Sequence, residues 1–413
     1  MLISLKINNC FAFNKPVELS LKADMRTKRF ANVNTISIAD NINVVKSTVI
    51  YGPNNTGKTA ILKCIKALKN TLLNIKTELR SNIFNENSTC EIGIVFEYKN
   101  KIYCYDYKYD DEKHQYVYEK FSEILIDNYG NEKEENIFLR DTIEDIYKLE
   151  GNEGQNFLSI FSTENLLMYT AETAKHDKLK EVKEILTNFA KSIEIVDMNE
   201  IPNQKTIEIL KNHDILAPKI VEFIKTADLY LEDMFYTNKI ENSEWFDGTE
   251  SEDNLKLRSV YKGVTVPSIN FDSVGTKKIV ALASYIIETI ENGKILFVDE
   301  LDSSLHCNIT RAIISLFNNG VNKNAQLICT IHDTSLLDIK RMFRKEQIWF
   351  TNKNEDKTEL YSLKDFSYLN DGVRETTDIR ELYNKGAFEA IPYPDLISVL
   401  LEGDTDSKEE SDE

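Results

Sequence analysis

A short stretch near the N-terminus carries the residue types that hold a chain of phosphates. An apolar run at 48–51 leads into G-x-x-x-x-G-K-T and then into residues with helical spacing. Glycines let such a loop wrap tightly round an anion, a lysine neutralises the outer phosphate oxygens, and a threonine hydroxyl ligates Mg²⁺ at the helix N-terminus. The pattern predicts a loop that binds a nucleoside triphosphate. Its residues are Gly52, Asn54, Asn55, Thr56, Gly57, Lys58 and Thr59.

Two further sets of polar residues follow apolar runs in the second half of the chain. The run at 295–298 ends in Asp299 and Glu300, and the run at 326–330 is followed by His332. Carboxyl ends of parallel strands meet at one sheet edge, where ligands bind. We expect Asp299 to hold Mg²⁺ and Glu300 to accept the proton of an attacking water. By itself His332 indicates a structural residue, but its position behind the other motifs favours a role near the γ-phosphate.

Ser273 and Gly275 stand at the start of a third helical pattern, whose apolar residues extend to Ile290. A helix N-terminus is an anion site, although an ordinary helix cap explains this pair equally well. Because the helix that begins near Lys58 already serves one phosphate site, we expect Ser273 and Gly275 to complete the site of a second subunit.

Composition limits the choice of protein class. The chain has 413 residues, 42% of them apolar, and a formal net charge of −18, from 50 basic and 68 acidic residues. This is enough for one large or two medium globular units, and the acidic balance gives no general attraction to nucleic acid or anionic lipid. The six cysteines lack metal-binding spacing, and no signal peptide or membrane span is expected. We therefore predict a cytoplasmic protein, with nucleic-acid binding left open only for a local basic groove.

Periodicity predicts an α/β fold. Alternating residues at 2–13 and 17–21 predict a hairpin beside the phosphate-loop strand, and 91–98, 101–109 and 116–126 predict a meander. A tyrosine stripe on the second meander strand, from Tyr103 to Tyr109, is expected to pack in the sheet rather than to stack on bases. The basic cluster at 25–30 is expected to be a solvated loop, with the alternative that Arg26 or Arg29 reaches a phosphate.

Five segments follow from these patterns. They are an N-terminal lobe at 1–135, a compact helical insert at 136–254, a C-terminal lobe at 255–350, an accessory segment at 351–400 and an acidic disordered tail at 401–413. An exposed loop is predicted around Trp245. No heptad pattern lasts long enough for a coiled-coil arm.

The order of these motifs resembles that of ABC-type ATPase heads of the SMC, RecF and OLD group. There a phosphate loop, a signature motif, a Walker B strand, a D-loop and a switch histidine follow one another. Here the corresponding stretches are the loop ending in Thr59, Ser273-Val274-Gly275, the run ending in Glu300, 301–306 and His332. The resemblance implies a mixed central sheet with flanking helices, an antiparallel N-terminal sheet, and ATP with Mg²⁺.

Longer blocks at 271–278, 297–306, 326–333, 346–350 and 360–366 look like the AbiLi/RloA-type bacterial ATPases of phage-defence loci. Similarity to that family's Gly-Ala-Ile-Pro ending appears at 386–392, with extra residues. The family usually has glutamate before the signature serine, where this chain has Asp272, and no Q-loop glutamine is assigned because Gln115 lies in a polar run.

This resemblance implies a homodimer or higher homo-oligomer joined through nucleotide, and a co-encoded effector such as a TOPRIM-type or other nuclease or toxin. The stretch at 396–406 is similar to the opening of a TOPRIM domain, but too few residues follow Glu402 to complete its metal site. The alternative function is a DNA-repair or DNA-clamping ATPase, against which the acidic charge and the missing arm count. A third alternative is a nucleotide-dependent scaffold that hardly hydrolyses.

Overall fold

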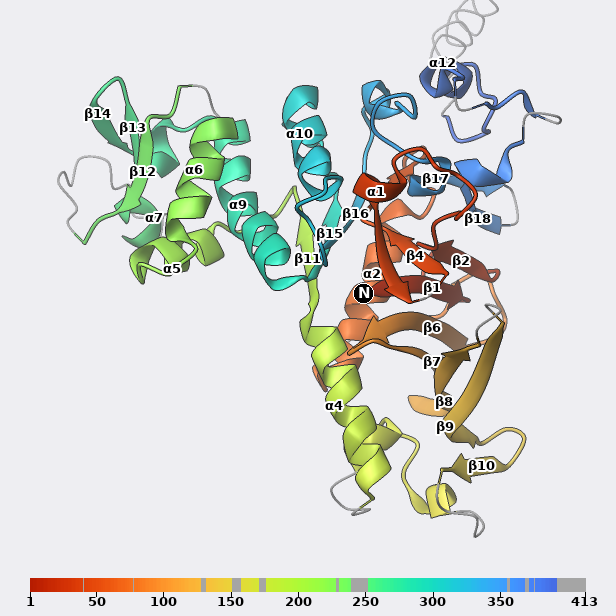
Figure 1. The fold of residues 1–413 in the computed structure, drawn as a ribbon. Coiled ribbons are helices and arrows are strands. Elements are labelled where there is room, and N and C mark those ends of the chain that lie inside the picture. The colour runs from red at the N-terminus through yellow and green to blue at the C-terminus, as the bar shows by residue number, and fades with distance from the viewer. Residues whose placement is uncertain are drawn as a thin grey trace, which may run out of the picture.

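Two large sheets meet along the N-terminal strands of the chain (Figure 1). The computed structural model describes residues 1–391 except 40, 77, 128–130, 151–156, 171–175, 228–229, 239–251, 355–356, 368–370 and 375. The sequence-predicted loop at Trp245 and the acidic tail at 401–413 lie outside the described residues.

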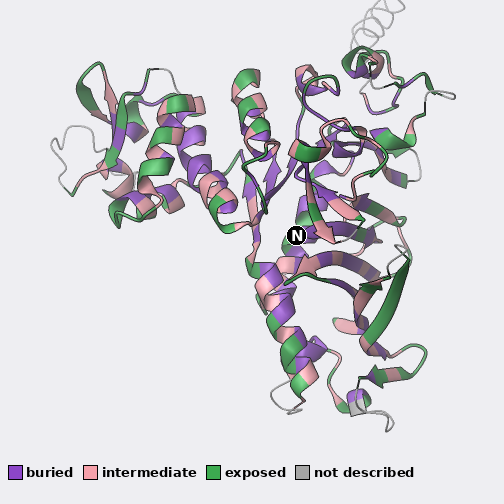
Figure 2. Cartoon of the chain, in the orientation of Figure 1, coloured by how far each residue is buried: buried purple, intermediate pink, exposed green. Residues whose placement is uncertain are grey.

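The central sheet is parallel apart from one edge strand. Its order is β11-β15-β16-β5-β17-β18, with only β18 antiparallel to its neighbour. These strands are β5 (Ser47–Tyr51), β11 (Ile193–Asp197), β15 (Ile295–Asp299), β16 (Gln326–Thr330), β17 (Ile348–Asn354) and β18 (Lys357–Ser362). Strands β5, β15 and β16 are buried along their whole length, as expected for a sheet covered on both faces (Figure 2).

Helices cover the two faces of this sheet separately. Ile295 and Phe297 of β15 pack in the cluster that contains α2 (Lys58–Leu72) and α4 (Asp177–Lys191). Leu296 and Val298 pack in the cluster that contains α9 (Val274–Asn292) and α10 (Cys307–Phe317). Because successive residues of a strand point to opposite faces, α2 and α9 lie on opposite sides of the sheet.

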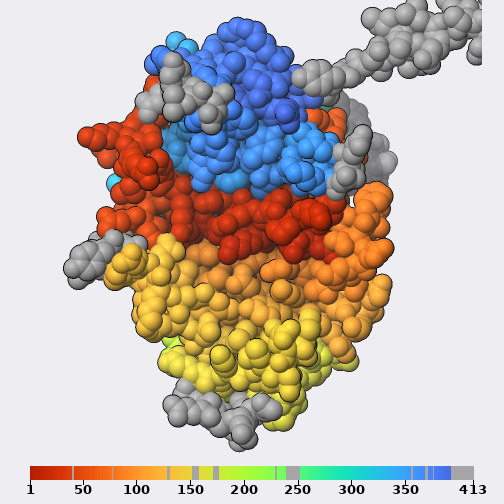
Figure 3. All heavy atoms as spheres, turned by 90° about the vertical axis from the view of Figure 1, so that its right-hand side faces the viewer, coloured from red at the N-terminus to blue at the C-terminus, as the bar shows by residue number. Residues whose placement is uncertain are grey.

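The second sheet is antiparallel, in the order β10-β9-β8-β7-β6-β1-β2. It consists of β1 (Leu2–Asn8), β2 (Val17–Ser20), β6 (Thr89–Tyr98), β7 (Lys101–Asp110), β8 (Gln115–Ile126), β9 (Glu132–Asp141) and β10 (Ile146–Leu149). The meander and the packed role of Tyr103, Tyr105 and Tyr107 are confirmed, since these three side chains are buried in the core cluster. Figure 3 shows the N-terminal residues, in red, as a belt between the orange and yellow residues, which include the later strands of this sheet, and the blue C-terminal segments.

The expected position of the N-terminal hairpin is wrong. Strands β1 and β2 do pair, but β1 continues to β6, whereas β5 is flanked by β16 and β17. Both neighbours of β5 come from the far end of the chain, so that local spacing carried no information about them.

A smaller unit lies beside α9 (Figure 1). Its sheet has the order β12-β13-β14, made of β12 (Asp233–Tyr236), β13 (Leu257–Tyr261) and β14 (Val264–Pro267). The helices α5 (Gln204–Lys211), α6 (Ala217–Ala227), α7 (Glu252–Lys256) and α8 (Ser268–Phe271) accompany it. Its core is continuous with Val280 and Ala283 of α9.

The single helical insert predicted at 136–254 is therefore wrong. The predicted helices α4 and α6 are present, but β9 crosses the boundary at 135, and β10 completes the antiparallel sheet. Strand β11 is an edge strand of the central sheet, and β12 belongs to the smaller unit. These strands are short and pair with distant segments, and the helical stripes around them dominated the sequence pattern.

Short elements complete the described chain. Near the N-terminus they are α1 (Ala31–Asn34), β3 (Thr35–Ala39) and β4 (Ile42–Val45), and between the β-meander and α4 they are η1 (Phe157–Ile160) and η2 (Leu167–Thr170). Toward the C-terminus they are η4 (Thr334–Leu336), η5 (Lys345–Gln347), η6 (Leu363–Asp365) and α12 (Ile379–Asn384). None of the helices in the described ranges is both long and apolar enough to cross a membrane.

Candidate functional site at the carboxyl edge of the central sheet

The predicted phosphate loop connects the end of β5 to the start of α2. Lys58 is buried, and its Nζ donates to the carbonyl oxygens of Gly52 at 2.6 Å and Pro53 at 2.8 Å, so its ammonium lies within the loop. Thr59, next along the helix, is exposed. Burial lowers the pKa of Lys58, while the carboxylates of Asp299, Glu300 and Asp302 oppose the shift. Strands β5 and β15 run parallel with only β16 between them, so the loop that holds this ammonium and the carboxylates at the end of β15 lie at the same sheet edge.

The loop has room only for glycine at two positions. Gly57 has φ 94° at the N-cap of α2, and a Cβ there would lie 2.9 Å from Thr358 Cγ2. A Cβ on Gly52 would lie 2.5 Å from the Thr351 carbonyl oxygen. The Thr56 hydroxyl donates to Pro53 O at 2.7 Å and closes the turn. Bare backbone amides at a helix N-terminus, together with a lysine inside the loop, are the donor set that a triphosphate requires.

The two acids after β15 differ in environment. Asp299 is buried and its Oδ1 accepts a hydrogen bond of 2.5 Å from the Thr330 hydroxyl, which in turn accepts one of 2.7 Å from the Glu300 amide. Glu300 has φ 52°, a left-handed conformation that side chains rarely adopt, and it is partly exposed. Such backbone strain is characteristic of functional sites. Thr330 thus holds both residues at the end of β15, with the Asp299 side chain buried and the Glu300 side chain accessible to solvent.

His332 lies beside Glu300. Its Nε2 is 3.9 Å from Glu300 Oε1, and both side chains are partly exposed. The loop that carries the histidine is held by Asp302, whose Oδ2 accepts from the backbone amides of His332 at 2.8 Å and Asp333 at 2.6 Å. Glu300 and His332 are therefore brought together from the ends of two neighbouring strands.

A chain of side-chain contacts runs from Glu300 to the helix α9. Asn199 Nδ2 donates to Glu300 Oε2 at 2.9 Å, and its Oδ1 accepts from the Ser303 hydroxyl at 3.2 Å. The Ser303 hydroxyl accepts from Lys278 Nζ at 2.9 Å. The carboxylate that follows β15 is thus connected within one subunit to the first turns of α9.

Ser273 and Gly275 stand at the N-terminus of α9, away from the phosphate loop. The exposed Ser273 is the N-cap and its side chain accepts from the Thr276 amide at 3.1 Å. A Cβ on Gly275 would lie 3.0 Å from the Ser304 carbonyl oxygen. Helix α9 covers the opposite face of the sheet from α2, and the contacts of Ser273 and Gly275 are with Thr276 and Ser304 rather than with the phosphate loop of the same subunit.

The unusual aspartate before Ser273 has a structural reason. Asp272 is buried and its carboxylate accepts from the hydroxyls of Ser259 at 2.9 Å, Tyr261 at 2.8 Å and Ser268 at 2.5 Å. A glutamate, longer by one methylene, would not fit these three donors without moving the loop.

Sequence reasoning missed several residues of the site. They are Asn199, Thr330 and Thr351, whose hydroxyl contacts that of Thr56 at 2.7 Å, whereas Asp302 and Ser303 fall in the expected D-loop at 301–306 without an assigned role. Thr330 ends β16 and Asn199 lies just after β11, and this position at the end of a strand is the signal that could have found them. Two residues that the sequence analysis discussed lie in other contacts. Gln115, which was not assigned as a Q-loop glutamine, opens β8 opposite Asp110. Arg29, the alternative phosphate ligand, donates to the Lys340 carbonyl.

A mixed central sheet, with a phosphate loop after β5, adjoins an antiparallel sheet, which is the arrangement expected from the resemblance to ABC-type ATPase heads. Residues 47–338 match the family described as "AAA domain, putative AbiEii toxin, Type IV TA system". That range is well over half of the chain, and the protein belongs to this family. Nucleotide binding and ATPase chemistry are general properties of this class of P-loop domain.

Solved structures similar to this chain include SMC heads. The SMC head domain from Thermotoga maritima is 13% identical, and the match covers 87% of this chain and 98% of that one with a TM-score of 0.42. An Smc head bound to the C-winged helix domain of ScpA is 13% identical, with 87% and 97% covered and a TM-score of 0.49. No curated protein sequence matches the chain.

Proposed function

We propose that the chain is an ATP-hydrolysing switch of the AbiLi/RloA type, in which ATP joins two subunits and the joined state controls a separate effector in bacterial defence against phage. The observation that carries the proposal is the position of Lys58, Asp299 and Glu300 at the carboxyl ends of the parallel strands β5 and β15, which are separated only by β16. Membership in a family described by a putative AbiEii toxin supports the link to defence systems.

Each residue has a separate task in this proposal. The loop amides and Lys58 bind the phosphates, and Thr59 and Asp299 would hold Mg²⁺, which neutralises phosphate charge when bound. Glu300 orients a water and accepts its proton, with His332 beside it to approach the γ-phosphate. Ser273 and Gly275 of the second subunit cover the phosphates from the other side, so binding closes the dimer and hydrolysis opens it.

The first test is ATP turnover with Mg²⁺. Lys58→Ala should abolish nucleotide binding because the loop loses its cation. Glu300→Gln should keep binding but lower kcat by roughly 10²–10⁴-fold, the usual contribution of a general base. Lys63→Ala and Glu291→Gln change exposed residues outside the loop and serve as matched controls. Equal turnover in wild type and Glu300→Gln would remove Glu300 from the mechanism.

The effector is tested separately. Purified chain with ATP and Mg²⁺ should leave DNA and RNA intact, and nucleolytic or toxic activity should require a co-encoded protein. Glu402, the acidic residue of the TOPRIM-like stretch, lies outside the described residues. Nucleic-acid cleavage by the chain alone that Glu402→Ala abolishes would contradict the effector proposal while leaving the ATPase intact.

A further inference from the structure

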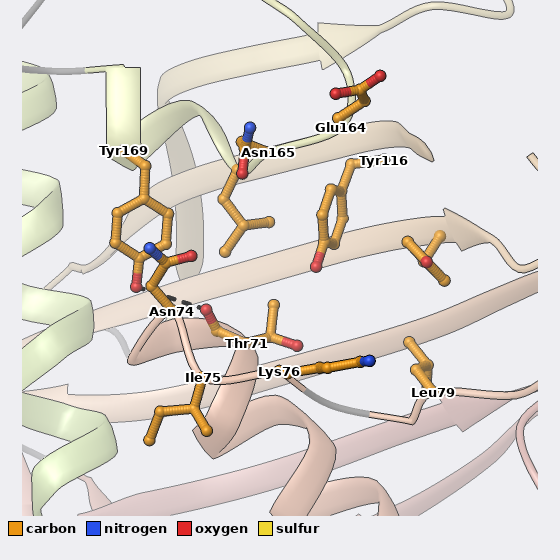
Figure 4. Close-up of a pocket in the computed structure, with 11 residues that line it drawn as sticks. Thr71, Asn74, Ile75, Lys76, Leu79, Tyr116, Glu164, Asn165 and Tyr169 are labelled. Carbon is orange, nitrogen blue, oxygen red and sulfur yellow. Dashed lines mark hydrogen bonds between the residues drawn. The ribbon is translucent and has the colours of Figure 1, made fainter. Parts of the chain in front are cut away.

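A second cavity lies at the far end of the helix that the phosphate loop begins. It has a volume of about 190 Å³ and is bounded by the end of α2, the residues after it, the edge of strands β7 and β8, and the segment around η2 (Figure 4). Nothing in the ATPase mechanism uses it. It is smaller than the roughly 300–1,000 Å³ of a pocket for a drug-sized molecule, and it opens to solvent, so it can enclose one ring system of a ligand whose remainder lies outside.

The walls of this cavity are fixed by buried contacts. Behind it, the Arg140 guanidinium pairs with the Glu119 carboxylate, and both side chains are fully buried. Arg140 also donates to the carbonyls of Ser162 and Asn165 at 3.0 Å each, which anchors the segment that forms one wall. Tyr169 in that wall donates to the Leu72 carbonyl at the end of α2 at 2.6 Å. Buried hydrogen bonds and an ion pair therefore hold the walls of the cavity in place.

Aromatic rings and hydroxyls dominate the lining. The rings of Tyr109 and Tyr116 are 5.0 Å apart at 54°, and Tyr169 lies on another side of the cavity. The Thr71 hydroxyl is buried near the hydroxyl groups of Tyr107 and Tyr116, but no hydrogen bond of good geometry satisfies it among the residues that the structure describes. Figure 4 shows the hydroxyl end of Tyr116 directed toward Thr71. An unsatisfied hydroxyl of this kind costs free energy unless a ligand or water pairs with it.

The charge of the lining favours an uncharged ligand. Lys76 and Glu164 are exposed side chains of opposite sign, and the amides of Asn74 and Asn165 are neutral. Burial raises the pKa of Tyr116 to about 12, so its phenol stays protonated at neutral pH. A phosphate group would find one cation and one anion here, together with the negative end of α2. Planar molecules with several donors and acceptors fit better.

We propose that this cavity binds a free nucleobase or nucleoside, stacked against a tyrosine ring and hydrogen-bonded by Asn74, Asn165 and the Thr71 hydroxyl. Bases stack on aromatic side chains, and an asparagine amide matches the paired donor and acceptor of a base edge. Because the ligand would contact the last turn of α2, its binding also changes the helix whose first turn holds the phosphates. A resulting change in ATP turnover would depend on the proposed ATPase function, whereas the binding of the nucleoside itself does not.

The experiment is isothermal titration of the full chain with adenosine, guanosine, cytidine and uridine. The Lys58→Ala background removes binding at the phosphate loop, so failure of the ATPase proposal does not affect the result. We expect at least one nucleoside to bind and its monophosphate to bind at least tenfold more weakly. Binding of only a zwitterion such as glutamine, of only a single-stranded oligonucleotide, or of none of these probes would overturn the assignment.

Variants locate the binding site. Tyr116→Ala should weaken nucleoside binding about tenfold or more, while Tyr116→Phe should retain most of it because the ring remains. Asn74→Gly keeps the left-handed backbone of this residue (φ 56°) and Asn165→Ala removes another exposed amide, and each should also weaken binding. Tyr118→Ala, on the same strand but outside the cavity, is the matched control. Unchanged affinity in both asparagine variants would show that the nucleoside binds elsewhere.

Discussion

The Glu300 carboxylate is held by a residue that lies 101 positions earlier in the chain. Asn199 donates to Glu300 Oε2 and at the same time accepts from Ser303. A carboxylate that must orient a water loses efficiency when it is free to rotate. Asn199 is therefore a positioning residue in the proposed mechanism, and its effect should appear in kcat.

We predict that Asn199→Ala lowers kcat about tenfold, equivalent to about 1.4 kcal/mol, with little change in KM, because ATP binding does not involve this amide. Steady-state ATPase assays measure both constants. Asn212→Ala, an exposed asparagine that follows α5, is the control. A rise in KM at unchanged kcat would assign Asn199 to binding instead.

Residues that form contiguous motifs were predictable, and residues that support them were not. Gly52, Gly57 and Lys58 stand at fixed spacing because one turn of backbone must surround the phosphates. Thr330 and Asn199 reach Asp299 and Glu300 only through strand pairing, so neither has a local pattern. The only sequence feature that could indicate these two residues is their position, at or just after the end of a strand.

At the scale of elements, the antiparallel sheet depends on one buried ion pair. Arg140 of β9 and Glu119 of β8 are both fully buried, and Glu119 also accepts from the Leu167 amide and from Tyr105. Burial raises the pKa of Glu119, and the Arg140 charge lowers it. Removing one partner leaves the other charge without compensation.

We predict that Arg140→Met lowers the free energy of unfolding by about 3–5 kcal/mol at neutral pH. Without Arg140 the Glu119 pKa rises further, so the folded state holds a proton that the unfolded state releases. The deficit should therefore shrink as the pH falls toward the unfolded-state pKa, and grow as the pH rises. Urea unfolding at pH 5 and pH 8 measures it.

Two controls make this test specific. The double variant Glu119→Gln/Arg140→Met should be more stable than Arg140→Met at neutral pH, since no buried charge remains. Arg380→Met removes an exposed arginine of α12 and should change little. A loss below 1 kcal/mol in Arg140→Met would mean that the pair contributes little.

The elements themselves were predictable in proportion to their length and local periodicity. The long helices α2 and α9 and the strands β6 to β8 have patterns that local spacing defines. Strand β11 has five residues and pairs in parallel with β15, about a hundred positions away. No local rule distinguishes such a strand from the end of the preceding helix, which explains why the insert was predicted as helical.

At the scale of the whole molecule, the positions of α2 and α9 on opposite faces of the central sheet favour a site shared between subunits. We predict that Lys58→Ala and Ser273→Arg subunits, each inactive alone, recover activity when mixed. The mixed dimer would contain one intact pair of Lys58 and Ser273. ATPase assays after subunit exchange test this.

The pairing of variants provides its own control. Lys58→Ala mixed with Glu300→Gln should stay inactive, because each subunit then carries a defect in its own phosphate site. Recovery in this mixture, or none in the first under conditions where subunits demonstrably exchange, would contradict the shared site.

The position of β5 between β16 and β17 has a consequence for folding during synthesis of the chain. The strand that leads into the phosphate loop emerges early from the ribosome, but its two neighbours are Gln326–Thr330 and Ile348–Asn354. Pairing over such separations must wait until the distant segments have been synthesised. The growing chain is therefore unable to form the candidate ATP site during most of its translation, and the phosphate loop takes its final position only once the central sheet has closed around β5.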